Sequence, residues 1–203
     1  MSLLFCGIIL QIKSQSFNQL WVSTGYGHSF NVFKLPLQKE REWLPVKSFL
    51  FGWQKVLNKN TSLQVGLGIN QIGYAVVFDV KDNFRLMSPN ARYRLNQFVI
   101  PILFNFSPTR NTRWQIQTGV LHGLYRSFIT TTAVLEGDVF TSNGFHYAAS
   151  WMVRSAFRVA SIKKTDISLF SGITPVVVNG LRQPQWLCAV EVGMTIRFKH
   201  IGE

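Results

Sequence analysis

The chain has 203 residues, of which 47% are hydrophobic, 14% aromatic and only 15% charged, and its formal net charge is +12. This composition excludes a disordered chain, and the length fits a single domain with no Pro-rich or Gly/Ser-rich linker. After the first residues, no stretch has the roughly 20 continuous apolar residues of a transmembrane helix, so strands would have to make any membrane crossing.

Residues 1–16 are predicted to be a cleaved signal peptide. The apolar run 3–10 is followed by Ser14-Gln15-Ser16, whose small residues suit signal peptidase. The alternative is that the run forms a buried first strand. If Cys6 leaves with the peptide, Cys188 is alone in the mature domain, 17–203, so we expect neither an intramolecular disulfide nor a Cys/His metal site, and no cofactor.

From Phe17 onward, apolar and polar residues alternate with the period of two that is typical of strands. Turn residues interrupt this pattern at regular intervals. The sequence predicts eight strands, at 19–30, 47–57, 62–79, 92–106, 113–135, 144–162, 166–178 and 185–199. Eight is the smallest even number found in single-chain outer-membrane barrels. The predicted fold is therefore all-β: a closed, antiparallel, up-and-down transmembrane β-barrel.

The predicted connections alternate between two kinds. Short polar turns at 58–61, 108–112 and 163–165 follow the second, fourth and sixth strands. Longer connections, at 31–46, 80–91, 136–143 and 179–184, follow the other strands. Outer-membrane barrels have short turns on the periplasmic side, so both chain ends are predicted to lie there. This alternation disfavours a Greek-key sandwich.

One face of each predicted strand is bulky and apolar. The residues expected to face lipid include Leu63, Val65, Leu67, Ile69, Trp186, Val190, Val192, Met194, Ile196 and Phe198. The opposite faces carry small and polar residues rather than the Lys and Glu of a water-facing strand, so we expect them to line a crowded lumen, with Gly66, Gly68, Gly119, Gly123, Gly172 and Gly193 inside. Aromatic residues near strand ends fit either interfacial girdles or an ordinary core: Trp21, Phe49, Trp53, Trp114, Tyr125, Trp186 and Phe198.

Several segments resemble the small outer-membrane β-barrel proteins of Gram-negative bacteria, a porin-like group that includes the OmpA-type transmembrane barrel. They are residues 97–106, the glycine-spaced 63–68 and 117–120, and the closing 190–198. The resemblance implies an integral protein of the cell outer membrane. One departure is that Phe198 is followed by further residues, whereas the final strand of such proteins often ends on an aromatic residue.

The charged residues suggest two sites. Inside the barrel, Arg154, Arg158, Arg197 and Glu191 fall on the polar faces and predict an ion-pair network that closes the lumen. At the outer rim, contacts with lipid phosphates or simple solvation are both open for Lys34, Lys39, Arg41, Lys47, Arg85, Arg92 and Arg94. The basic residues are spread along the chain, so no nucleic-acid partner is expected.

No catalytic residue is predicted. His28 and Ser29 are adjacent, and adjacent residues of a strand point to opposite faces. The leading hypothesis is a non-enzymatic structural or interaction protein that acts through its long loops, in contact with outer-membrane lipid and other outer-membrane proteins, for example as a subunit of a larger complex. A narrow pore, a lipid-modifying enzyme and a soluble lipocalin-like binding barrel remain alternatives.

Overall fold

A computed structural model describes residues 19–32, 43–77, 80–82, 85–87, 90–108, 113–132, 146–178 and 185–199. These residues form strands and turns, and none of them is helical. The strands are β1 (Gln19–Asn31), β2 (Leu44–Val56), β3 (Thr61–Val77), β4 (Val80–Asp82), β5 (Arg85–Met87), β6 (Asn90–Phe106), β7 (Trp114–Thr132), β8 (His146–Ile162), β9 (Thr165–Val178) and β10 (Gln185–Lys199). In this described part of the chain, no helix is long and apolar enough to cross a membrane.

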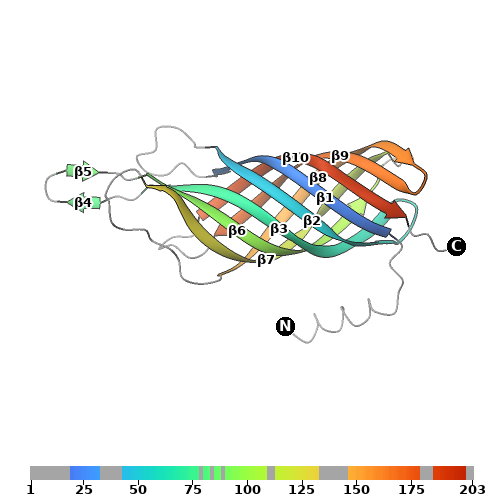
Figure 1. Cartoon of the computed structure of the whole chain (residues 1–203), viewed down its shortest axis with the longest axis horizontal. Helices are drawn as coiled ribbons and strands as arrows, with labels where there is room; N and C mark the ends of the chain where they lie inside the picture. The colour runs from blue at the N-terminus through green and yellow to red at the C-terminus, as the bar shows by residue number, and fades with distance from the viewer. Residues whose placement is uncertain are drawn as a thin grey trace, which may run out of the picture.

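Eight of the strands close into a barrel in the order β1-β10-β9-β8-β7-β6-β3-β2 (Figure 1). Every neighbouring pair is antiparallel, and β1 pairs with β10 from Gln19↔Lys199 to Asn31↔Leu187, which closes the sheet. β4 and β5 form a separate two-stranded hairpin between β3 and β6. The predicted closed, antiparallel up-and-down barrel is therefore confirmed.

The strand bounds agree with the predicted ones to within a few residues, with one addition. The prediction assigned residues 80–91 to a loop, whereas the structure places the β4–β5 hairpin there and begins β6 at Asn90. Strands of three residues are too short for the alternation of apolar and polar residues to reveal them, so the sequence pattern does not distinguish this hairpin from a loop. The hairpin therefore lengthens a connection without adding a strand to the barrel.

The two kinds of connection lie at opposite rims of the barrel. One rim holds the ends of β1 and β10 at Gln19 and Lys199 and the short connections, and the other holds the long connections, with the β4–β5 hairpin projecting beyond it (Figure 1). We call these the short-turn rim and the long-connection rim. At the short-turn rim, β8 and β9 are joined by Lys163-Lys164, and Lys163 has a φ of 51°. That left-handed conformation is what a tight two-residue hairpin turn requires.

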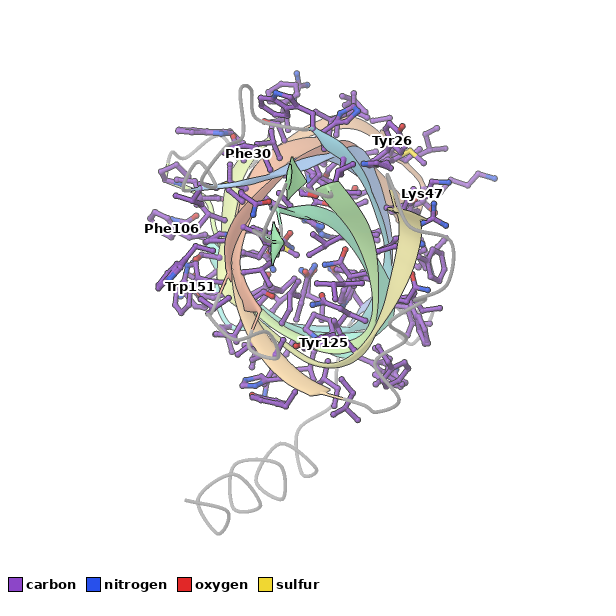
Figure 2. The ribbon with its side chains drawn as sticks, turned by 90° about the vertical axis from the view of Figure 1, so that its left-hand side faces the viewer. Tyr26, Phe30, Lys47, Phe106, Tyr125 and Trp151 are labelled. Carbon is purple, nitrogen blue, oxygen red and sulfur yellow. The ribbon has the colours of Figure 1, made fainter. Side chains whose placement is uncertain are left out.

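The exterior of the barrel is apolar. On β2, for example, Phe49, Phe51 and Trp53 are exposed, while the residues between them point inward and are buried. All ten residues that were expected to face lipid lie on this outward face, exposed or half-buried. Figure 2 shows Phe106 and Trp151 pointing away from the barrel and Tyr125 pointing into it. Apolar surface of this extent on a closed sheet fits lipid, not water.

Two of the aromatic residues for which a girdle or a core position was open lie inside the barrel. Trp21 is 1% exposed and Tyr125 is 2% exposed, because both occupy inward positions of the alternation. The Trp21 indole donates a hydrogen bond to the carbonyl of Trp53. The other five lie on the exterior: Phe49, Trp53, Trp114, Trp186 and Phe198.

The apolar belt spans most of the height of a membrane core. Outward-pointing Lys47 and Lys55 bracket the aromatic part of β2, and they are separated by roughly 26 Å of strand at about 3.3 Å per residue. With a strand tilt of about 35–45°, this corresponds to roughly 18–21 Å along the barrel axis, which is most of the apolar band of about 25 Å in outer-membrane barrels. The exterior therefore matches a bilayer in polarity and spans most of the height of its core.

An arginine in the middle of this belt should destabilise the barrel. Val192 lies at the centre of β10 and is 60% exposed, so Val192→Arg should cost about 2–4 kcal/mol of the free energy of unfolding in phospholipid vesicles. The measurement is urea titration followed by tryptophan fluorescence. The matched control, Ile162→Arg at the short-turn rim, should cost about 0–1 kcal/mol. Equal losses at the two positions would contradict a lipid-facing belt.

Candidate functional site in the barrel interior

Side chains fill the interior of the barrel in layers. Near the long-connection rim lies a cluster of eight buried residues, which we call the apolar plug: Val46, Ile72, Leu95, Tyr125, Ala148, Val176, Leu187 and Ala189. A second buried apolar cluster lies deeper in the barrel: Trp21, Leu50, Val99, Leu103, Leu121 and Met152. In a barrel of eight strands the lumen is just wide enough for side chains to fill it, and here they do.

An ion pair joins β8 to β10 across β9. Arg154 and Glu191 are both opposite Gly172 in the strand register. Arg154 donates from Nη2 and Nε to Glu191 Oε1, over 2.6 and 3.0 Å, and its Nη1 donates to Ser23 Oγ over 3.3 Å. Ser48 donates to Glu191 Oε2 over 2.8 Å. Both charges are therefore paired and hydrogen-bonded, the condition under which buried ions are tolerated.

Small residues make the room that this ion pair occupies. A Cβ atom at Gly172 would lie 2.4 Å from Arg154 Cγ, and one at Gly25 would lie 2.6 Å from Glu191 Oε2. Phe170 stacks on the arginine, with Cζ of Arg154 4.0 Å from the ring centroid, and a Cβ at Gly193 would collide with that ring. These glycines are therefore part of the ion-pair site.

The other two predicted interior arginines lie in a separate cluster near the short-turn rim. Arg158 Nη1 is 3.6 Å from Asp166 Oδ2, and Arg197 is opposite Asp166 in the register of β9 and β10. Arg197 donates from Nη1 to Ser168 Oγ over 3.4 Å. The four residues expected to form one network thus form two clusters, because Arg158 and Arg197 lie further along β8 and β10, nearer the short-turn rim, than Arg154 and Glu191.

Sequence reasoning missed Asp166, although a signal for it was present. Asp166, Ser168, Phe170 and Gly172 occupy alternate positions of β9, so an inward Gly172 implies an inward Asp166. The prediction used only the acid of the last strand.

A layer of amides also went unpredicted. Gln64 donates to Gln54 over 2.7 Å, and Gln117 donates both to Gln64, over 2.6 Å, and to Asn105, over 2.9 Å. Asn105 in turn donates to Ser62 over 3.2 Å. This chain of hydrogen bonds joins β2, β3, β6 and β7 inside the barrel near the short-turn rim.

The residues expected at the outer rim are only partly described. Lys47 and Arg94 are exposed and point outward near the long-connection rim, and Figure 2 shows the position of Lys47. Arg85 and Arg92 lie in β5 and β6, whose side chains at these positions are outside the described part. Lys34, Lys39 and Arg41 also lie outside the described residues.

The structure separates His28 from Ser29. His28 is exposed on the outer face, whereas the buried Ser29 hydroxyl donates to the carbonyl of Gly73. A second histidine on the outer face, His122, shares a hydrogen bond of 2.7 Å between its Nδ1 and the Tyr147 hydroxyl. Among the described residues, no three His, Cys, Asp or Glu side chains are grouped so that they could hold a metal ion.

Comparison with known proteins identifies the fold. No family model and no curated protein matches the chain. Among solved structures, Neisserial surface protein A (NspA) is 13% identical, with a TM-score of 0.51, and the match covers 89% of this chain and 97% of that one. OprG from Pseudomonas aeruginosa is 8% identical over 92% of this chain and 98% of its own, with a TM-score of 0.45.

The chain is also similar to Ail of Yersinia pestis, solved in complex with the heparin analogue sucrose octasulfate. The identity is 10% over 90% of this chain and 100% of that one, with a TM-score of 0.41. The match to NspA, at 13% identity and a TM-score of 0.51, shows a shared fold, and the predicted resemblance to small outer-membrane barrels is confirmed at that level. Closed backbone pairing and an apolar exterior define an integral membrane β-barrel of the outer-membrane type.

Removing one partner of the central ion pair should be costly. Glu191→Gln keeps the size of the side chain but leaves Arg154 buried without its counter-charge, so the free energy of unfolding should fall by about 3–5 kcal/mol. The measurement is urea titration in vesicles. The double variant Arg154→Met/Glu191→Leu removes both charges and should recover most of this loss. A Glu191→Gln protein as stable as the wild type would show that the pair contributes nothing to the fold.

Proposed function

We propose that the protein is a non-enzymatic integral barrel of the bacterial outer membrane, which acts as a structural or interaction protein at its long-connection rim and does not pass solutes through its lumen. The observation that carries this proposal is the filled interior. Side chains from all eight barrel strands occupy it, and many are completely buried, including Leu50, Ile72, Leu95, Leu103 and Leu187.

The layers obstruct the lumen in different ways. In the described part of the lumen, the apolar plug lies near the long-connection rim, and its only polar side-chain group is the hydroxyl of Tyr125. Buried Ser29 and Asn31 lie at the same level. Deeper in the barrel, Arg154 and Glu191 are held by several hydrogen bonds, so moving either side chain aside breaks a buried ion pair. Water-filled barrels have a wider, polar and solvated lining.

The long-connection rim faces the outside of the cell in the predicted topology. The β4–β5 hairpin projects beyond the barrel at this rim (Figure 1). Loops carried by a rigid scaffold are where binding functions are concentrated. A partner protein in the outer membrane, or on the surface it faces, would meet this rim first.

The wild-type protein should not conduct ions. In planar lipid bilayers it should give no discrete current steps above background, because the apolar plug and the ion pair block the lumen. The interior triple variant Ile72→Ala/Leu95→Ala/Leu187→Ala should raise the conductance above the wild-type level. The exterior control Ile69→Ala/Phe98→Ala/Val190→Ala removes similar volume from neighbouring outward positions and should stay at background. Discrete steps from the wild type would support the narrow pore instead.

A direct assay addresses the enzymatic alternative. The purified protein is incubated with phospholipid and lipopolysaccharide, and the released fatty acid is measured. We expect none above a detergent blank. Release that disappears in His28→Ala would overturn the non-enzymatic proposal.

A further inference from the structure

The interior cluster at the short-turn rim has more positive than negative charge. Among the described inward-facing side chains, three arginines face two acids, and Glu191 is already paired with Arg154. Asp166 lies near both Arg158 and Arg197, and its Oδ1 accepts a hydrogen bond from Ser161. Arg158 forms an ion pair with Asp166, whereas Arg197 forms no ion pair with any described residue.

Arg197 is the charge that lacks compensation. It is 4% exposed, and its Nε has no hydrogen-bond acceptor in the described structure. Its hydrogen bond to Ser168 is long, at 3.4 Å, and goes to a neutral hydroxyl. Burying a charged donor in this way is unfavourable unless another anion shares the site.

The cluster is accessible from the periplasmic side of the predicted topology. The Arg158 side chain is 26% exposed and lies near the end of β8. The turns and strand ends around it carry exposed cations, namely Lys59, Arg113, Lys163 and Lys164, and Asp166 is the one acid among the described residues of this rim. A cationic rim around a recessed arginine attracts anions and raises their local concentration.

We propose that the short-turn end of the lumen is a binding site for a phosphate-type oxyanion, held between Arg158 and Arg197. A tetrahedral oxyanion can accept from both guanidinium groups and from the Ser168 hydroxyl, and it supplies the acceptor that Arg197 Nε lacks. Arginine is the residue best suited to such contacts, because its planar fork of donors matches the spacing of phosphate oxygens.

The phosphate can come from either of two sources. It can be a soluble phosphate in the periplasm, or the headgroup of a phospholipid in the inner leaflet, since the short-turn rim lies at the level of those headgroups. This site does not depend on whether the lumen conducts, because it lies between the short-turn rim and the central ion pair, and the apolar plug lies on the other side of that pair.

The test uses the full chain in an uncharged, phosphate-free detergent. Calorimetry measures the binding of inorganic phosphate at constant ionic strength, and the second arm adds phosphatidylglycerol to the micelles. Saturable binding of inorganic phosphate supports a soluble ligand, and saturable binding of phosphatidylglycerol alone supports a lipid headgroup. No saturable binding of either probe overturns the proposal.

Variants assign the binding to the cluster. Arg197→Met and Arg158→Gln should each weaken binding by roughly tenfold or more, the effect of losing a charge-assisted hydrogen bond. Lys163→Gln removes one exposed charge from the same rim and should weaken binding by about twofold or less, because it lowers only the local anion concentration. Equal weakening in all three variants would show general attraction to a cationic rim and would overturn the site.

A stability measurement separates binding from a purely structural role. Without phosphate, Arg197→Met should unfold at the same temperature as the wild type or higher, because it removes an uncompensated buried charge. With saturating phosphate, only the wild type should shift upward. If Arg197→Met does not fold, Arg197→Lys keeps the charge but not the Nε donor, and it should fold and bind more weakly. Wild-type affinity in Arg197→Lys would contradict the role given to Nε.

Discussion

The pairing of β1 with β10 is the constraint on which the rest of the structure depends. In a bilayer, backbone N–H and C=O groups have no water to bond with, so each must find a partner within the protein. An open sheet would leave two unpaired edges, and the register from Gln19↔Lys199 to Asn31↔Leu187 removes both. Closure with eight strands then sets a narrow lumen, which decides how much of each inward side chain can fit.

The narrow lumen explains the composition of the inward face. Glycines at positions 25, 172 and 193 leave the space that Arg154, Glu191 and Phe170 fill. The outward face has no such limit, so bulky aromatic and branched residues gather there. The outward face is therefore apolar, unlike that of a soluble barrel, whereas the inward face carries both apolar and polar residues. Together these inward side chains fill the interior. This closure is why we favour a role at the long-connection rim over transport.

Much of this architecture could be predicted from the sequence. The period of two located the barrel strands, and the alternation of short and long connections indicated the two rims. The inward position of Tyr125 follows from the same alternation that places Gly123 inside, but the residue type alone left its position open. Two features could not be predicted from pattern alone. The β4–β5 hairpin is too short to have a clear period. Glu191 pairs with Arg154 and not with Arg158 or Arg197. This choice depends on the strand register, which places Glu191 and Arg154 opposite the same residue of β9, Gly172.

The most direct test of the account is spin-label accessibility along β10 in phospholipid vesicles. Cys6 and Cys188 are replaced by serine, and single cysteines from 189 to 196 carry the label. Oxygen, which partitions into lipid, should reach the labels at Val190, Val192 and Ile196, whereas those at Ala189 and Thr195 should be shielded from both oxygen and a water-soluble nickel complex. Nickel access at the inward positions would contradict the filled lumen, and nickel access at the outward positions would contradict the membrane barrel.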